Sequence, residues 1–250
     1  MSDAMAAEFG TVAEWTAEAA VELGKDCYIP AACRGSGSPA ALDWLIEHLD
    51  LSPGETLLDC GAGVGGPAAY AAEQRSVRPI LVEPEAGACR GARALFDHPV
   101  VQAVGSMLPL ADETFDAAWA LGVLCTMREQ LELLTELRRV VRPGGRIGLL
   151  VFVVRASGGD QPEGNNFPSV ASLTHLVARA ELSIDDWQGT TKLPPIPRAW
   201  LRREEEVTAR LRERHGGKNA WRLAEGQSDT MGRLLAESFV SGELLTLHRK

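Results

Sequence analysis

A glycine-rich turn between a short apolar strand and a helix constrains the fold of this 250-residue chain more than any other feature. Residues 57–66 read Leu-Leu-Asp-Cys-Gly-Ala-Gly-Val-Gly-Gly. Glycine is required where the backbone takes a positive φ or approaches a ligand closely. Such a turn presents backbone N–H groups at a helix N-terminus, which suits an anionic or carboxylate-bearing ligand. Glu83 ends the next apolar run, about 20 residues on, where a carboxylate can accept both hydroxyls of a ribose.

Apolar runs and helical stretches alternate from residue 55 onward. Strands are predicted at 56–58, 79–82, 100–104, 116–121, 146–154, 182–192 and 244–248. Helices are predicted at 4–23, from 39, at 66–75, 86–96 and 127–141, from 169, and near 198–214 and 228–239. Strands separated by helices imply right-handed crossovers and a parallel sheet. We therefore expect a doubly wound, mostly parallel, Rossmann-like seven-stranded α/β sheet with an N-terminal helical arm and a helical insertion before the last strand.

The charge balance and the cysteines exclude several classes of function. The formal net charge of −9 argues against a protein that grips nucleic-acid phosphates or adsorbs to anionic lipid. The longest apolar stretch, 147–154, is too short to span a bilayer, and the acidic N-terminus does not resemble a signal peptide. The five cysteines are odd in number and lack zinc-ligand spacing. We expect reduced thiols in a cytoplasmic protein without a metal site.

Three segments together resemble class I S-adenosylmethionine (SAM)-dependent methyltransferases. The first is the glycine turn from Leu58, whose Gly-Gly-Pro-Ala ending resembles the branch of sterol, ubiquinone, menaquinone and natural-product enzymes. The second, 108–116, reads Leu-Pro-Leu-x-Asp-x-x-Phe-Asp, and the third, 137–145, reads Leu-Arg-Arg-Val-Val-Arg-Pro-Gly-Gly. They occur in the family's order over roughly residues 42–155, which specifies the family far better than a glycine turn alone.

The resemblance implies the cofactor SAM and places its contacts. Asp59 would help fix the methionine moiety, Glu83 would bind the ribose, and Pro84 would lie near the adenine. The remaining contacts of the loop and of the strand ends would be Gly61, Ala62, Gly63 and Leu121. Asp59 has a second interpretation, as a strand-end acid that holds its own glycine turn.

One position departs from the family's pattern. An acid usually stands four residues before the Leu of Leu-Pro and accepts from the adenine amino group, whereas this chain has Val104. Adenine would then be held by a backbone N–H near Gly105 or Ser106 and by apolar contact with Met107. Losing one such hydrogen bond should cost on the order of 1 kcal/mol.

The sequence does not specify the methyl acceptor, and it indicates only which segments border the acceptor's binding site. We expect one domain over 1–250, with an N-terminal arm at 1–38, a SAM-binding core at 39–155 and a substrate lid at 193–240. Residues 25–39, rich in Pro and Gly, are predicted to be flexible. Arg34 in this arm is either a partner of the methionine carboxylate or a solvated arginine. His175 is the nearest candidate base, on a helix face that is solvent-exposed unless the lid covers it.

The expected function is SAM-dependent methyl transfer to an O, N or C atom of a small molecule. Two alternatives remain. One is a protein of the same fold that catalyses another reaction or only binds, and the other is an NAD(P)-dependent oxidoreductase that shares the glycine loop. The expected partners are a small-molecule acceptor and, in a possible homodimer, a second copy of the chain. No nucleic-acid or membrane partner is expected.

Overall fold

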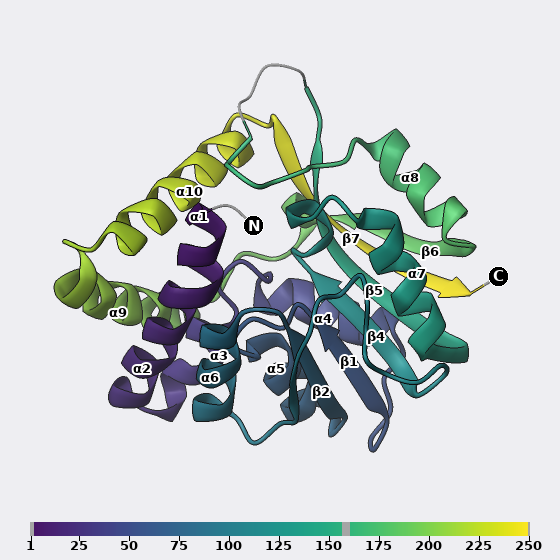
Figure 1. Cartoon of the computed structure of the whole chain (residues 1–250), viewed down its shortest axis with the longest axis horizontal. Coiled ribbons are helices and arrows are strands. Elements are labelled where there is room, and N and C mark those ends of the chain that lie inside the picture. Colours follow the sequence, from purple (N-terminus) through teal and green to yellow (C-terminus); the bar gives the residue numbers. More distant parts are fainter. Residues whose placement is uncertain (1–2, 157–160, 250) are drawn as a thin grey trace.

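The computed structural model describes residues 3–156 and 161–249 and has a seven-stranded sheet at its centre (Figure 1). The strand order is β3-β2-β1-β4-β5-β7-β6, in which β1 to β5 pair in parallel and β7 runs antiparallel to both β5 and β6. The strands are β1 (Thr56–Cys60), β2 (Arg78–Glu83), β3 (Val100–Gln102), β4 (Phe115–Leu121), β5 (Val141–Val154), β6 (Leu182–Gly189) and β7 (Val240–Arg249). The predicted doubly wound, mostly parallel sheet is confirmed.

Helices cover both faces of this sheet. One face buries Leu133 and Leu173 of α7 and α8, and the other buries Leu45 of α4 against Trp119 of β4. The helices of the core are α4 (Pro39–His48), α5 (Gly66–Arg75), α6 (Ala86–Leu95), η3 (Leu124–Thr126), α7 (Gln130–Val140) and α8 (Val170–Arg179). Because β1, β2 and β4 run parallel to one another, their carboxyl ends meet at one edge of the sheet.

A second helical layer lies beside the sheet and joins the two ends of the chain. It contains α1 (Asp3–Ala6), the π-helical η1 (Ala7–Val12), α2 (Ala13–Leu23), η2 (Lys25–Cys27), α3 (Tyr28–Ala32), α9 (Arg198–His215) and α10 (Asn219–Ala236), while the short η4 (Thr190–Lys192) lies against β7. Here α2 packs on α6, α9 packs on α2 and α3, and α10 packs on α1 and η1 (Figure 1). Val207 and Leu211 of α9 are buried in this contact.

The prediction of a flexible segment at 25–39 is wrong, because this segment is packed against the core. Cys27, Ala31 and Cys33 are buried, at 3%, 4% and 1% exposure. The close approach depends on glycine: a Cβ atom on Gly66 would lie 2.4 Å from the carbonyl carbon of Ala32. Pro and Gly in this stretch therefore shape a tight helical turn rather than a mobile loop.

Several element boundaries differ from the predictions; β5, for example, begins at Val141 rather than at 146. β3 ends at Gln102 rather than at 104, and residues 190–192 form the short helix η4 rather than the end of a strand. α10 begins at 219, not near 228, and β7 begins at 240 because its pairing with residues 146–154 of β5 starts at the pair Val154 and Val240. Of the predicted loop 155–168, residues 157–160 lie outside the described residues. No helix in the described ranges is long and apolar enough to cross a membrane.

Candidate functional site

The carboxyl ends of β1 and β2 bring two acids and the glycine turn together. Asp59 and Glu83 are almost completely buried, at 1% and 5% exposure. The backbone N–H of Gly63 donates to Oε2 of Glu83 at 2.8 Å, and the N–H of Glu85 donates to Oε1 at 2.9 Å. Glu83 therefore ties the glycine turn to its own strand end, while each of its oxygens keeps acceptor capacity for a further donor.

Gly61 and Gly63 of the turn lack a side chain for different structural reasons. A Cβ atom on Gly61 would lie 2.3 Å from Cγ2 of Val123, so this glycine permits packing of the loop after β4. Gly63 has a φ of +55° and would place a Cβ atom with no other atom within 4 Å. The sequence did not distinguish these roles. Gly63 faces the open space in which a ligand can approach the backbone.

Gly63→Val tests this open space. The branched side chain enters the ligand's volume rather than the protein, so we expect folded protein whose affinity for S-adenosylhomocysteine is at least about tenfold lower. Gly54→Val is the matched control, because Gly54 also has a positive φ (+85°) and open surroundings but lies before β1. Calorimetry measures both affinities. Equal affinities in the two variants would remove Gly63 from the site.

The two acids are strongly desolvated. Burial raises the pKa of Asp59 from 3.8 to about 7; Trp119 and the backbone of Ala68 lower it in part, while the charge of Glu83 adds to the rise. Burial likewise raises the pKa of Glu83 to about 7, against hydrogen bonds from the N–H groups of Glu85 and Gly63. Oδ2 of Asp59 and Nε1 of Trp119 have no hydrogen-bond partner within 3.5 Å among the described residues, although the indole N–H of Trp119 lies close enough to lower the pKa of Asp59. A buried carboxylate oxygen without a donor is costly, which indicates a site completed by a ligand.

These raised pKa values predict that ligand binding is linked to protons. Donors from a ligand favour the ionised carboxylates, so binding should release protons near pH 7 and tighten as the pH rises from 6 to 8. In the free protein the sign is opposite: acids with raised folded-state pKa values stabilise the fold below pH 4, and this contribution is lost as the pH rises through about 7. Calorimetry of S-adenosylhomocysteine in two buffers of different ionisation enthalpy measures the release. Proton uptake would contradict the assignment.

The segment 104–112, which follows β3, forms a partly exposed wall next to Glu83. Val104 and Met107 are 46% and 73% exposed, which leaves two apolar side chains open to a ligand. Gly105 has no room for a side chain, since a Cβ atom would lie 2.8 Å from both Sγ of Cys60 and Cδ1 of Leu133. Pro84 lies at the start of this wall, and its carbonyl accepts a hydrogen bond from Nε2 of Gln102 at 3.0 Å. Gln102 was not among the predicted site residues.

Val104→Asp tests whether this wall holds adenine. Because Val104 is 46% exposed, the new carboxylate remains solvated and should change the stability of the free protein by no more than about 0.5 kcal/mol. With an acceptor for the amino group, binding should tighten by roughly 0.5–1.5 kcal/mol, seen as a larger thermal shift with saturating SAM than the wild type shows. Val104→Leu is the control. A shift equal to that of the control would mean that this position does not meet the adenine.

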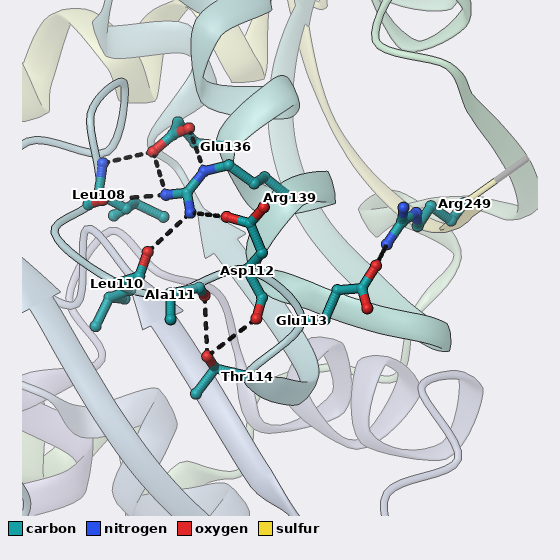
Figure 2. A network of polar contacts seen from close by, with 9 residues as sticks. All are labelled: Leu108, Leu110, Ala111, Asp112, Glu113, Thr114, Glu136, Arg139 and Arg249. Carbon is teal, nitrogen blue, oxygen red and sulfur yellow. Dashed lines mark hydrogen bonds and ion pairs between the residues drawn. The ribbon is translucent and has the colours of Figure 1, made fainter.

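The wall is held in place by Arg139 of α7, at the centre of a polar network (Figure 2). Its guanidinium donates to the carbonyls of Leu108 and Leu110 and to the carboxylates of Asp112 and Glu136. Glu136 in turn accepts the backbone N–H of Leu108 at 2.7 Å. The network connects the segments 108–116 and 137–145, so the two sequence motifs are in direct contact. The spacing of Glu136 and Arg139 on one helix face was a signal for it in the sequence.

Of the predicted site residues, His175 lies elsewhere, and Arg34 forms no ion pair with the residues that the structure describes. His175 is exposed on α8, which packs on α7 and β6, so the structure does not bring it to the edge where Asp59 and Glu83 meet. Arg34 follows α3 and is exposed. Burial raises the pKa of the carboxyls of Glu8 and Glu204, and the positive charge of Arg34 lowers the pKa of both in part. The other predicted residues, Ala62, Ser106 and Leu121, line the same edge as the glycine turn.

A model of the methyltransferase domain family matches residues 58–149, which include the glycine turn, Glu83, the exposed wall and Arg139. Residues 58–149 belong to the methyltransferase domain family. The predicted family is thereby confirmed, and the methyltransferase domain covers all but the first and last parts of the parallel sheet.

Similar proteins carry methyltransferase names and extend over different lengths. Methyltransferase GfsG of Streptomyces halstedii is 34% identical over 123 residues, which are 46% of this chain and 44% of that protein. The chain thus covers less than half of the length of this relative. A demethylmenaquinone methyltransferase of Corynebacterium kroppenstedtii is 28% identical over 181 residues, 72% of this chain and 76% of that protein. The match to it extends well beyond the methyltransferase domain.

Solved structures support the fold over most of the chain. The crystal structure of the (4+2)-cyclase SpnF superposes with a TM-score of 0.66 at 25% identity, and covers 83% of this chain and 79% of that one. Geranyl diphosphate C-methyltransferase of Streptomyces coelicolor A3(2), in complex with S-adenosylhomocysteine, superposes with a TM-score of 0.59 at 19% identity over 84% and 77% of the two chains. At this identity, the second structure shows the shared fold alone.

Proposed function

We propose that the chain transfers a methyl group from SAM to an O, N or C atom of a small molecule. The observation that carries the proposal is the pair of buried acids, Asp59 with an unpartnered oxygen and Glu83 with free acceptor capacity, on either side of the open backbone at Gly63. These residues fit the cofactor: Glu83 suits two ribose hydroxyls, Gly63 admits a close approach, and Met107 offers an apolar surface to a flat base.

SAM supplies an electrophilic methyl group on a sulfonium, so the protein needs alignment more than acid–base chemistry. Asp59 and Glu83, on adjacent strands, would hold the methionine moiety and the ribose of the cofactor. The hydrogen bonds of Arg139 keep the wall (104–112) in a fixed position. Leu121, at the end of β4, is 4% exposed and contributes an apolar boundary that excludes water on the acceptor side. No described residue acts as a base in this proposal.

The decisive experiment has two steps. Calorimetry with SAM, S-adenosylhomocysteine and NADH shows which cofactor binds, and binding of NADH alone would favour the oxidoreductase. Incubation with methyl-labelled SAM and a panel of hydroxyl, amine and quinone-type acceptors then tests for transfer and for formation of S-adenosylhomocysteine. Label in an acceptor is the expected result.

A second candidate is a non-methylating reaction in the same fold. The structure of SpnF covers 83% of this chain, and SpnF is described as a (4+2)-cyclase rather than as a methyltransferase. Tight binding of SAM without any transfer to the acceptor panel would favour this function. In that case S-adenosylhomocysteine should support the non-methylating reaction as well as SAM does.

We also propose how the whole chain is organised. Residues 1–250 would act as one domain in the cytoplasm, in small-molecule metabolism, with 193–240 as a lid over the acceptor and without nucleic-acid or membrane partners. The net charge of −9 supports the expectation that the chain has no nucleic-acid partner. A homodimer is consistent with this organisation, and its presence is tested by light scattering.

A further inference from the structure

A polar pocket lies between the start of α7, the first turn of α8 and the loop that joins β5 to α8. It has a volume of about 630 Å³. None of the described residues that line it belongs to the glycine turn, to the ends of β1 and β2 or to the wall (104–112). Figure 1 shows α7 and α8 on the right of the view, and α9 and α10 on the left. The pocket is therefore separate from the candidate cofactor site.

Hydrogen bonds hold the loop that forms one side of this pocket. Nε2 of Gln130 donates to the carbonyl of Leu124 at 2.9 Å and to that of Asn166 at 2.7 Å. From α10, Nε2 of Gln227 donates to the carbonyl of Glu163 at 2.9 Å. The loop is thus connected to both η3 and α10, so the pocket is formed before any ligand binds. A preformed pocket loses little conformational freedom on binding.

The side chains that line the pocket have unused hydrogen-bonding capacity. Those of Arg128, Glu163 and Asn166 form no hydrogen bond or ion pair with the residues that the structure describes. Asn165 uses only Nδ2 and Gln161 only Oε1, which leaves the other amide atom of each without a bond inside the described ranges. Several of these side chains are exposed, so water bonds to them in the free protein. A ligand with matching groups can replace this water.

Two properties of the lining select the class of ligand. Carboxamide side chains both donate and accept hydrogen bonds, as hydroxyl groups do, so four of them in one pocket match a ligand with several hydroxyls. These four are Gln130, Gln161, Asn165 and Asn166. The two charged residues of the lining, Arg128 and Glu163, have opposite signs and give it no net charge. Sites for apolar ligands are lined mainly by hydrophobic side chains, whereas this lining is mostly polar.

We propose that this pocket binds a neutral, hydroxyl-rich ring, that is, a sugar or a cyclic polyol. Its hydroxyls bond to the free amide atoms and to the charged groups of Arg128 and Glu163. The inference goes beyond the proposed function and does not depend on it, because it involves none of the residues assigned to the cofactor. The ring is either a free compound or a part of a larger molecule, and the test separates these two sources.

Nuclear magnetic resonance of the isotope-labelled full chain measures the binding. Glucose, myo-inositol and phenyl glucoside are each added up to about 50 mM. We expect at least one of them to shift the backbone amide signals of 161–168 in a saturable way and to leave those of 61–66 unchanged. Binding of phenyl glucoside at least about tenfold tighter than glucose indicates a ring that is part of a larger molecule. Equal affinities indicate a free compound.

Two variants connect the binding to the pocket. Asn166→Ala and Arg128→Met remove only side-chain groups that have no bond to the described residues, so both proteins should fold. Each should weaken the binding of the best probe by about fivefold. Arg179→Met is the matched control, because Arg179 is an equally unpaired, exposed arginine among the described residues but lies in the last turn of α8. It should bind the probe as the wild type does.

Three outcomes overturn the inference. The first is that none of the three probes gives saturable shifts at 161–168. The second is that Asn166→Ala and Arg128→Met both bind the best probe with the affinity of the wild type. The third is that sodium sulfate, added at the same concentration, saturates the same signals more tightly than the hydroxyl-rich probes do, because the pocket would then bind anions.

Discussion

Glu83→Ala should lower the affinity for S-adenosylhomocysteine by about 10- to 100-fold, because hydrogen bonds to a charged acceptor contribute roughly 1.5–3 kcal/mol. The effect has two sources. The variant loses the acceptor for the ribose hydroxyls, and it frees the N–H of Gly63, which Glu83 holds at 2.8 Å. Gly63 would then lose its hydrogen bond to β2, while the N–H groups of Gly61 and Ala62 still donate to the carbonyl of Val82. Calorimetry with SAM and with its product should give equal losses.

A 2′,3′-dideoxy analogue separates the two sources. In the wild type this analogue should bind far more weakly than the parent compound, whereas in Glu83→Ala both should bind alike. Glu83→Gln is the conservative control, since the amide retains one acceptor oxygen for a backbone N–H. If the analogue binds the wild type as tightly as the parent compound does, Glu83 holds only the glycine turn and not the ribose.

Arg139→Met should lower the free energy of unfolding by about 3 kcal/mol, or roughly 6–12 °C in Tm. Methionine keeps the apolar stem of the side chain, but the carbonyls of Leu108 and Leu110 and the carboxylate of Glu136 lose their donor (Figure 2). Glu136 is only 17% exposed in its side chain, so water replaces the lost donor poorly. The expected result is a less stable protein whose wall at 104–112 is also more mobile.

Arg138→Met is the matched control for this prediction. Arg138 is the neighbour of Arg139 on α7 and forms one ion pair, with Glu181, whose side chain is 69% exposed. A pair of this kind contributes at most about 1 kcal/mol. Thermal melts of the two variants give the comparison. Equal shifts would mean that Arg139 acts as an ordinary surface arginine and that the link between the two motifs is not structural.

The sequence predicted those parts of the fold and site that depend on residues close together in the chain. The glycine turn between β1 and α5, and Glu83 at the end of β2, follow from local patterns, because strand, turn and helix are encoded within a few tens of residues. Such patterns also predicted the doubly wound sheet, which is confirmed. The site residues themselves remain a prediction until cofactor binding is measured.

The helices near 4–23 and 198–214 were predicted, but the contacts of the helical layer were not, because these contacts depend on the absence of side chains rather than on apolar periodicity. A Cβ atom on Gly87 would lie 2.4 Å from the carbonyl oxygen of Gly10, and Gly66 admits α3 in the same way. A glycine within a helix gives no sign in the sequence of the partner that it admits.

The position of β7 has a consequence for how the protein is made. β7 separates β5 from β6 in the sheet, yet it follows α8, β6, α9 and α10 in the chain. During synthesis the ribosome must therefore extend the chain through all these elements while the free edge of β5, among the most apolar strands, has no neighbour. An exposed apolar edge of this kind can pair with other nascent chains. Translational pausing or truncation before residue 240 would thus favour aggregation, and binding of a chaperone to 141–154 would protect the growing chain.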